Sequence, residues 1–310
     1  MPRRQLAPGV EIVAVDGRTL AVRTPDGEFL RFRAGDADVD ALRARLAGAD
    51  TADADGEVDR LVAAFGAAGY LTETGDAGED GHSTPAAVTA ADGHPAGTQD
   101  TGRQAQDSTA GAATAAWPAE RRHILVLGDP VLTEPLTRLL REAGAEPRPG
   151  TPGEAVAPDA AAVVWCLDGP VPDGLWDDAD RLPEQGVAWL RCHREGWQVY
   201  LEPVAAAPSD VTSTHLRARR LAATPAHREL AAYWSGPRTA GAPVRLTAPA
   251  AALLAALLAD DLTRWATDAP DAGALPARRR LRRVDLRTLT VTEHPVLPVP
   301  DVARTPVTAR

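Results

Sequence analysis

Residues 123–147, HILVLGDPVLTEPLTRLLREAGAEP, have the types and spacing of a strand, a phosphate-binding turn and a helix. Four apolar β-formers start the segment at Ile124, and leucines then recur at helical spacing from Leu132 to Leu140. A turn that holds ATP or a dinucleotide needs several glycines, because backbone N–H groups must approach the phosphates with no Cβ in the way. This turn offers Gly128 alone.

Other side chains at the same turn disfavour an anion. Asp129 and Glu134 would repel a phosphate, and Pro130 has no N–H to donate at the start of the helix. The chain also contains no lysine, which excludes a P-loop lysine and Schiff-base chemistry. The sequence therefore predicts a nucleotide-binding fold that has lost its nucleotide, and no cofactor in this chain.

Cysteine and histidine usage gives no metal site. The two cysteines, Cys166 and Cys192, fall in short strand patterns and are expected to be reduced thiols in the core. A four-cysteine zinc site is therefore not available. His193, His215 and His227 do not form the pattern of a Ser/Asp or Cys relay.

Composition bounds the partners and the location. The chain has 310 residues, a formal net charge of -10 and a pI near 5.2. Its length predicts about two domains, and its acidity argues against nucleic acid or an anionic membrane as partner. No apolar run approaches the roughly 18 residues of a membrane span, and the N-terminal residues lack the apolar core of a signal peptide. We expect a cytoplasmic protein.

The N-terminal part predicts a small winged-helix-like domain at residues 1–74. Three strands are expected at 10–15, 20–23 and 28–33, joined by the turn sequences DGR and TPDG. Two amphipathic helices follow, with apolar faces formed by Val39, Leu42 and Leu46 and by Val58, Leu61, Val62 and Phe65. Residues 75–117 contain almost no large apolar side chain and are expected to be a disordered linker.

Residues 118–310 return to an α/β pattern and predict a degenerate Rossmann-like domain. Strands are expected at 123–127, 160–167 and twice within 186–203, with a last strand at 283–289 that continues to 292. Helices are expected at 132–143, at 215–234 with a break at Pro225, and at 250–265. The whole chain is therefore expected to be an α/β protein.

Two further sets of residues are candidates for contacts with partners. The arginine-rich run 278–283, RRRLRR, is expected to be a solvated loop, with docking to an acidic partner as the alternative. Trp165 is expected in the core, whereas Trp176 and Trp234 are expected to be exposed anchors of an interface.

Two stretches of the chain resemble known proteins. Residues 6–48 and 57–71 look like the precursor-peptide recognition element of pathways that modify ribosomally made peptides. Residues 123–147 and 281–303 are similar to the ThiF-like half of azole-forming cyclodehydratase complexes. Together they resemble the ThiF-like leader-binding partner proteins of thiazole/oxazole-modified peptide and thiopeptide systems.

The resemblance implies a peptide-binding site in the N-terminal domain. In that family the leader of the precursor adds as an antiparallel strand to the third strand, with its side chains in the cleft beside the last helix. The third strand here is EFLRFR, in which alternate side chains point to opposite faces. The implied peptide-binding residues are Phe29, Leu30, Arg31, Phe32, Arg33, Val58, Leu61, Val62 and Phe65.

Two interpretations of these residues stay open at this point. The apolar ones, Leu61 and Phe65 above all, would serve equally well as the core of a small domain. Arg31, Arg33 and Arg60 could pair with acidic residues of a leader or could form a solvated face.

The chain departs from the adenylating members of the ThiF superfamily. Those proteins have a glycine-rich ATP loop, an arginine and a lysine on the phosphates, and paired CxxC motifs for zinc. Val211 and Thr214 stand near the position of the first cysteine pair, and Val302 stands in the C-terminal motif. We therefore expect neither zinc binding nor adenylation by this chain.

These observations lead to one hypothesis and two alternatives. The chain would be a non-catalytic scaffold that binds the leader of a precursor peptide and docks on a separate YcaO-type cyclodehydratase, which forms azolines with ATP and Mg²⁺. A homodimer is left open. The first alternative is a divergent adenylating enzyme of the ThiF superfamily. The second is a winged-helix DNA-binding regulator, although Glu57 and Asp59 make its last helix acidic for contact with phosphates.

Overall fold

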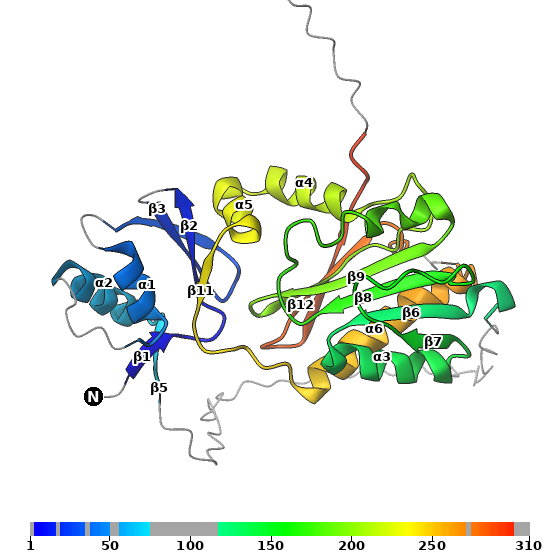
Figure 1. The fold of residues 1–310 in the computed structure, drawn as a ribbon, viewed down its shortest axis with the longest axis horizontal. Coiled ribbons are helices and arrows are strands. Elements are labelled where there is room, and N and C mark those ends of the chain that lie inside the picture. The colour runs from blue at the N-terminus through cyan, green and yellow to red at the C-terminus, as the bar shows by residue number, and fades with distance from the viewer. Residues whose placement is uncertain are drawn as a thin grey trace, which may run out of the picture.

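The computed structural model describes residues 3–16, 19–34, 38–49, 56–74, 117–270 and 274–300. The predicted linker, apart from Trp117, lies outside these residues, as does Val302. The described chain is an α/β protein with two lobes, as the sequence predicts (Figure 1). The smaller N-terminal lobe and the larger C-terminal lobe lie end to end.

The N-terminal lobe is built on a four-stranded antiparallel sheet in the order β11-β2-β3-β4. Its first three strands in sequence form a meander, β2 (Glu11–Asp16), β3 (Thr19–Arg23) and β4 (Phe29–Arg33). Two helices follow, α1 (Val39–Leu46) and α2 (Gly56–Ala67). A separate two-stranded sheet pairs β1 (Arg3–Leu6) with β5 (Leu71–Thr74).

Strand alternation explains how the N-terminal lobe is packed. Leu20 and Val22 of β3 point to α1 and α2, where they meet buried leucines of α1 in one apolar cluster. α1 begins at Asp38, whose carboxylate accepts the N–H groups of Asp40 and Ala41. The two helices thus cover one face of the sheet.

The fourth strand of this sheet comes from the other end of the chain. α5 (His227–Ser235) and β11 (Arg238–Ala240) follow the linker in sequence but lie against the N-terminal sheet (Figure 1). β11 pairs antiparallel with β2, and Leu230 and Tyr233 of α5 pack on Val13. The contacts of the small lobe therefore cross the expected domain boundary at 118, a feature that the sequence patterns did not indicate.

The C-terminal lobe contains a seven-stranded mixed sheet in the order β13-β12-β10-β9-β8-β6-β7. The parallel part comprises β6 (His123–Gly128), β7 (Glu146–Pro149), β8 (Ala162–Leu167) and β9 (Ala188–Glu195). The antiparallel part adds β10 (Gln198–Leu201), β12 (Arg280–Asp285) and β13 (Thr290–Pro295). Two 3₁₀ segments, Ala119–Arg121 and Ala179–Gln185, connect these elements.

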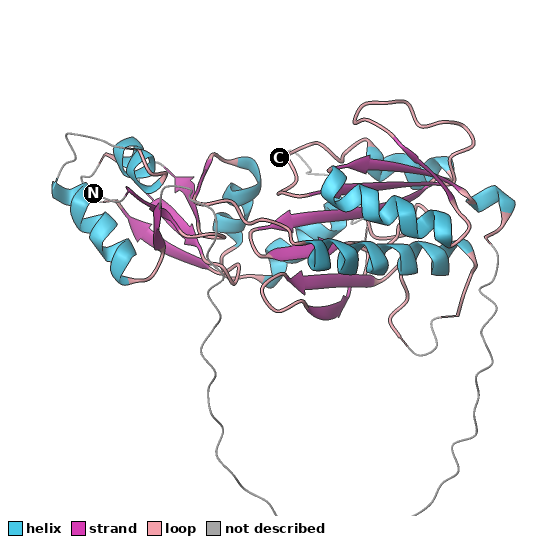
Figure 2. Cartoon of the chain, turned by 90° about the horizontal axis from the view of Figure 1, so that it is seen from below, coloured by secondary structure: helices cyan, strands magenta, loops and turns pink. Residues whose placement is uncertain are grey.

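Two helices cover one face of this sheet side by side, α3 (Pro130–Glu142) and α6 (Ala248–Ala266) (Figures 1 and 2). Leu254, Leu258 and Leu262 of α6 are buried in the main core, so the leucine-rich helix belongs to the inside of the lobe. The opposite face carries a tryptophan-rich cluster and α4 (Ser213–Ala223). The predicted break between the two helices at Pro225 is confirmed.

Three expectations for the C-terminal lobe are wrong. The arginine-rich run is not a solvated loop, because Arg280 and Arg282 lie in β12 and both bind the buried carboxylate of Asp261 on α6. The predicted last strand is a hairpin of β12 and β13, which turns at Leu289 with a positive φ. Trp176 is only 3% exposed and packs edge-on against a second tryptophan.

Candidate functional site

β4 is an edge strand whose outer side has no partner strand among the described residues. The N–H of Thr24 donates to the carbonyl of Glu28 at 2.8 Å, so the backbone of Glu28 faces β3. Alternation then turns the backbone groups of Leu30 and Phe32 toward β3 as well. The N–H and C=O groups of the three intervening residues, Phe29, Arg31 and Arg33, point away from the sheet. They form a template to which an extended chain could add as a further strand.

The predicted apolar residues of the site fall on the helix side of β4. Phe32 packs edge-on against Phe65 with ring centroids 5.3 Å apart, and Val58 is fully buried in the same cluster. Val58 and Phe65 therefore hold the lobe together. Leu61 and Val62 are half-buried against this cluster. Leu30, in contrast, is 46% exposed, so it is available at the edge.

The other side of β4 is engaged by α5. The guanidinium of Arg31 forms an ion pair with Glu229, whose side chain is fully buried, and its Nη2 donates to Oε2 at 3.0 Å. The ring of Phe29 meets that of Tyr233 with centroids 6.0 Å apart. Arg31 is thus fixed within the chain, and the C-terminal part of the sequence supports the exposed strand from behind.

The remaining predicted cations differ in their surroundings. Arg60 forms an ion pair with Glu57 on its own helix, α2, with 2.6 Å between Nη2 and Oε2. Arg33 lines a hollow of about 410 Å³ at the end of β4, together with Phe32, Arg31 and, from α5, Arg228. α5 therefore borders the end of this strand.

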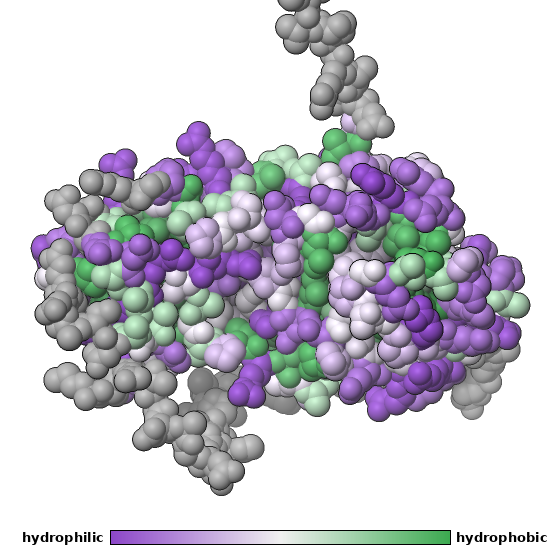
Figure 3. Space-filling view, in the orientation of Figure 1, coloured by the Kyte–Doolittle hydropathy of each residue, from purple (hydrophilic) through white to green (hydrophobic). Residues whose placement is uncertain are grey.

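A larger groove of about 590 Å³ lies at the other end of β4, between the two lobes. The N-terminal lobe contributes Glu28 and Phe29, and α5 contributes Leu230. The C-terminal sheet supplies the opposite wall, which includes Tyr200, Leu281, Arg283 and His294. On the face of the molecule seen in Figure 3, hydrophobic residues lie in separate groups between hydrophilic ones.

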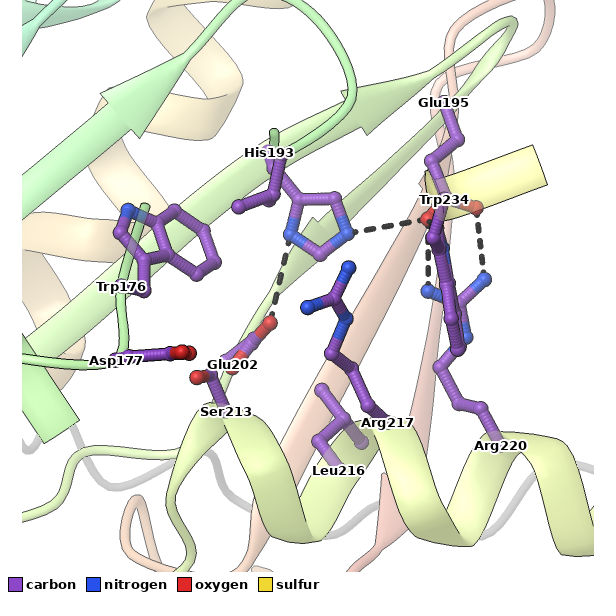
Figure 4. Close-up of a pocket in the computed structure, with 11 residues that line it drawn as sticks. Trp176, Asp177, His193, Glu195, Glu202, Ser213, Leu216, Arg217, Arg220 and Trp234 are labelled. Carbon is purple, nitrogen blue, oxygen red and sulfur yellow. Dashed lines mark hydrogen bonds and ion pairs between the residues drawn. The ribbon is translucent and has the colours of Figure 1, made fainter. Parts of the chain in front are cut away.

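A buried cluster of charged side chains joins the lobes beneath α4 (Figure 4). His193 of β9 lies between Glu195 and Glu202, with N–O distances of 3.4 and 3.5 Å. Glu195 binds Arg220 of α4 through both carboxylate oxygens, at 2.9 and 2.7 Å, and also accepts the indole N–H of Trp234 at 2.9 Å.

Glu195 also reaches the N-terminal sheet. Its backbone carbonyl accepts Nη2 of Arg23 at 2.9 Å, and Arg23 is buried against Tyr233. Burial alone would raise the pKa of Glu195, but Arg220 and His193 hold the pKa of this carboxyl well below its ordinary value. Burial alone would lower the pKa of Arg220, yet the Glu195 carboxylate raises it. The carboxylate therefore stays ionised between two arginines.

This cluster has the residue types of a catalytic site, but it has no room for a substrate. The enclosed volume among His193, Glu195, Glu202 and their neighbours is about 20 Å³, which is enough for roughly one water molecule. Its carboxylates are matched by arginines from both lobes. The geometry fits a structural connection, in which charge pairing offsets the cost of burial.

The degenerate turn after β6 is filled by the chain itself. A Cβ on Gly128 would lie 1.8 Å from the carbonyl oxygen of Cys166, so glycine is required for close packing against β8. Asp129 starts α3, but its carboxylate accepts the N–H of Asp168 at 2.6 Å and does not cap the helix. The carboxylate of Asp129 thus lies at the turn where a nucleotide-binding fold holds a phosphate.

The described residues contain no group of three or more His, Cys, Asp or Glu side chains that could hold a metal ion. Cys166 and Cys192 are free, buried and opposite each other on β8 and β9, and a hydrogen bond of the Cys192 thiol with Cys166 together with burial raises the pKa of that thiol. His215 forms a capping box with Thr212 at the start of α4. In the same described part of the chain, no helix is long and apolar enough to cross a membrane.

Comparison with known proteins gives distant likenesses only. No protein-family model matches the sequence, and no curated protein matches it significantly. Among solved structures, a heterocyclase in complex with substrate and cofactor aligns with a TM-score of 0.41 and 14% identity, over 96% of this chain and 39% of the heterocyclase. This chain therefore spans about two fifths of that protein's length.

Two Escherichia coli structures are also similar. A chain of the E. coli microcin synthetase McbBCD complex aligns with a TM-score of 0.44 and 10% identity, over 97% of this chain and 99% of the other. E. coli MccB aligns with a TM-score of 0.38 and 8% identity, over 59% and 64%. At these scores the likenesses do not assign an activity to this chain.

Two features of the site escaped sequence reasoning. The first is the contribution of α5 and β11 to the N-terminal lobe, because neither a short strand nor an isolated helix indicates its distant partner. The second is the charged cluster around His193, whose members are scattered between residues 23 and 234. The alternation of charged residues in 191–195, RCHRE, within an apolar strand was its one local signal.

Proposed function

We propose that this protein binds the leader of a ribosomally made precursor peptide as an added strand on β4 and presents the rest of the peptide to a separate YcaO-type cyclodehydratase. The observation that carries the proposal is the outer side of β4, which has no partner strand in the described part of the chain and where the backbone N–H and C=O groups of Phe29, Arg31 and Arg33 point outward. Main-chain hydrogen bonds from these residues provide affinity, and side chains such as the exposed Leu30 provide specificity.

The proposal assigns no chemical step to this chain. The buried cluster around His193 lacks space for a substrate, and the carboxylate of Asp129 occupies the turn after β6. ATP and Mg²⁺ belong to the enzyme partner in this proposal. The scaffold would act by raising the local concentration of the core peptide at that enzyme. The C-terminal lobe would provide the docking surface.

The main test is selection of random peptides by display against the immobilised full chain, followed by backbone N-methylation of a selected peptide at each position in turn. Strand addition predicts a period of two: methylation at alternate residues abolishes binding, because those N–H groups would bond to β4. Methylation at the residues between them leaves binding nearly unchanged. Failure to enrich any peptide, or sensitivity without alternation, would rule out strand addition.

A second measurement tests the role in catalysis. A YcaO-type enzyme, ATP and Mg²⁺ are incubated with a precursor peptide with and without this protein, and ring formation is followed as loss of water by mass spectrometry. We expect the protein to accelerate the reaction while releasing no pyrophosphate from ATP on its own. Pyrophosphate release by the isolated chain would favour the adenylating alternative instead.

A further inference from the structure

We propose that the groove between the lobes is a second peptide subsite, which binds the stretch that follows the strand-forming segment of the precursor. The proposal rests on strand addition at β4. In this subsite, one large apolar side chain packs against Phe29, Leu230 and Leu281, and a neighbouring carboxylate binds Arg283. The C-terminal lobe would then contact the precursor directly, in addition to docking on the cyclodehydratase.

The position of the groove follows from the direction of β4. Phe29 is the first residue of β4, and both it and Glu28 line the groove. A strand that adds antiparallel to β4 runs from the Arg33 end to the Phe29 end, so its C-terminal continuation arrives at the groove. At about 3.3 Å per residue, the first one or two residues beyond the paired segment lie within it. The groove is thus continuous with the template edge.

The walls of the groove suit a large apolar side chain. Leu230 of α5 and Leu281 of β12 are each almost fully buried, so they form the inner wall, and Phe29 and Tyr200 are half-buried at its sides. The ring of Tyr200 is covered by the guanidinium of Arg220 at 4.1 Å from its centroid. Because Glu195 already binds this guanidinium, Arg220 is a fixed part of the wall.

The charges of the groove favour a peptide that carries a carboxylate next to its large apolar side chain. Arg220, Arg283 and His294 line it, against Glu28 as the one carboxylate among the lining residues. Arg283 forms no ion pair with a carboxylate in the described part of the chain. Instead its Nε donates to Oε1 of Gln198 at 2.9 Å and its Nη2 to the carbonyl of Asp26 at 3.0 Å. It is therefore held in place across the two lobes with its charge uncompensated.

The experiment uses the full chain and a strand peptide selected on it as described above. The peptide is extended at its C-terminus by Ser-Phe-Asp or, as control, by Ser-Ala-Asn, and affinities are measured by fluorescence anisotropy. Ala223→Trp fills the groove from the exposed end of α4, and Ala222→Trp is the matched control, because the exposed Ala222 does not line the groove. A further control carries Ser-Phe-Asp at the N-terminus.

We expect the C-terminal Ser-Phe-Asp extension to tighten binding by at least about tenfold, the effect of one buried anchor side chain. Ala223→Trp should abolish this gain without changing the affinity of the unextended peptide, and Ala222→Trp should leave the gain intact. The inference is overturned if the extension adds nothing, if Ala223→Trp leaves the gain unchanged, or if the N-terminal extension gives the gain instead. These results leave strand addition standing, whereas failure to select any strand peptide removes both proposals.

Discussion

Two edge strands of this molecule, β7 and β4, present opposite surfaces to a foreign chain. The N–H of Glu146, at the start of β7, donates to the carbonyl of Arg122, and the N–H of Gly150, directly after β7, donates to the carbonyl of Val126 on β6. Alternation therefore turns Pro147 and Pro149 outward, and neither has an N–H to offer. On β4 the corresponding outward positions hold Phe29, Arg31 and Arg33, which all retain their donors.

The difference shows that the fold blocks one edge and leaves another free. Edge strands invite unwanted pairing, and prolines are a common way to prevent it. The N-terminal sheet covers its first edge with β11 from the far end of the sequence, while β4 has no such cover among the described residues. The side chains on one face of β4 also pack against α5. This selective exposure is what a strand-binding function requires.

The largest loss of stability is expected at the buried charges that connect the N-terminal sheet to the C-terminal lobe. Glu195→Gln removes the charge that neutralises Arg220 and Arg23, and breaking a buried pair of this kind costs about 3 to 5 kcal/mol of unfolding free energy. Urea unfolding followed by tryptophan fluorescence measures the loss. Glu120→Gln, at an exposed position, is the matched control and should change stability by less than about 0.5 kcal/mol.

The same substitution changes the dependence of stability on pH. The folded pKa of Glu195 lies below its ordinary value of 4.5, so its contribution is complete above that value and is lost as the pH falls toward the folded pKa. The wild-type protein should therefore lose stability faster than Glu195→Gln as the pH is lowered through this range. Parallel curves for the two proteins would contradict the assignment.

The next effect concerns the packing of α5 behind the free edge. Leu230→Ala removes a buried side chain that contacts the N-terminal sheet, and large-to-small changes of this kind cost about 2 to 5 kcal/mol. Hydrogen exchange of β2 and β4 should rise more than that of β8. Leu297→Ala, at a 61% exposed position, serves as control. Uniform protection throughout would show that α5 does not support the edge.

A smaller effect is expected at the ion pair on β4 itself. Arg31→Ala leaves Glu229 buried without its cation, at a cost of about 1 to 2 kcal/mol, since Arg31 itself is half-exposed. Adding Glu229→Gln should restore part of the loss, because the buried charge is then absent. If the double variant is less stable than Arg31→Ala alone, the two residues do not act as a pair.

The smallest change in stability is expected for substitutions on β7, the edge strand that carries the prolines. Replacing both Pro147 and Pro149 by Thr restores two outward N–H groups on β7 and should lower stability by about 1 kcal/mol, because Pro147 is buried whereas Pro149 is exposed. The expected result is concentration-dependent association in analytical ultracentrifugation. A variant that stays as dispersed as the wild type would show that the prolines do not block this edge.

The sequence predicted what local patterns can encode. The meander, the position of its third strand and the strand-turn-helix after His123 depend on period and turn chemistry, and all three are found. The arginines of β12 could not be placed, because their partner Asp261 lies within an apolar helix and only packing brings them together. Val58, one of the residues implied for the peptide site, is buried in the apolar cluster of the small lobe, and an apolar helix face has the same sequence pattern in either role.

The pairing of β11 with β2 has a consequence for synthesis on the ribosome. Residues 238–240 leave the exit tunnel long after β2, β3 and β4 have emerged, because the whole parallel part of the C-terminal sheet lies between them in the sequence. Until then the nascent meander has two open sides and lacks the helix behind it. Translation speed and chaperone access during that interval would therefore decide how much of the protein reaches its native form.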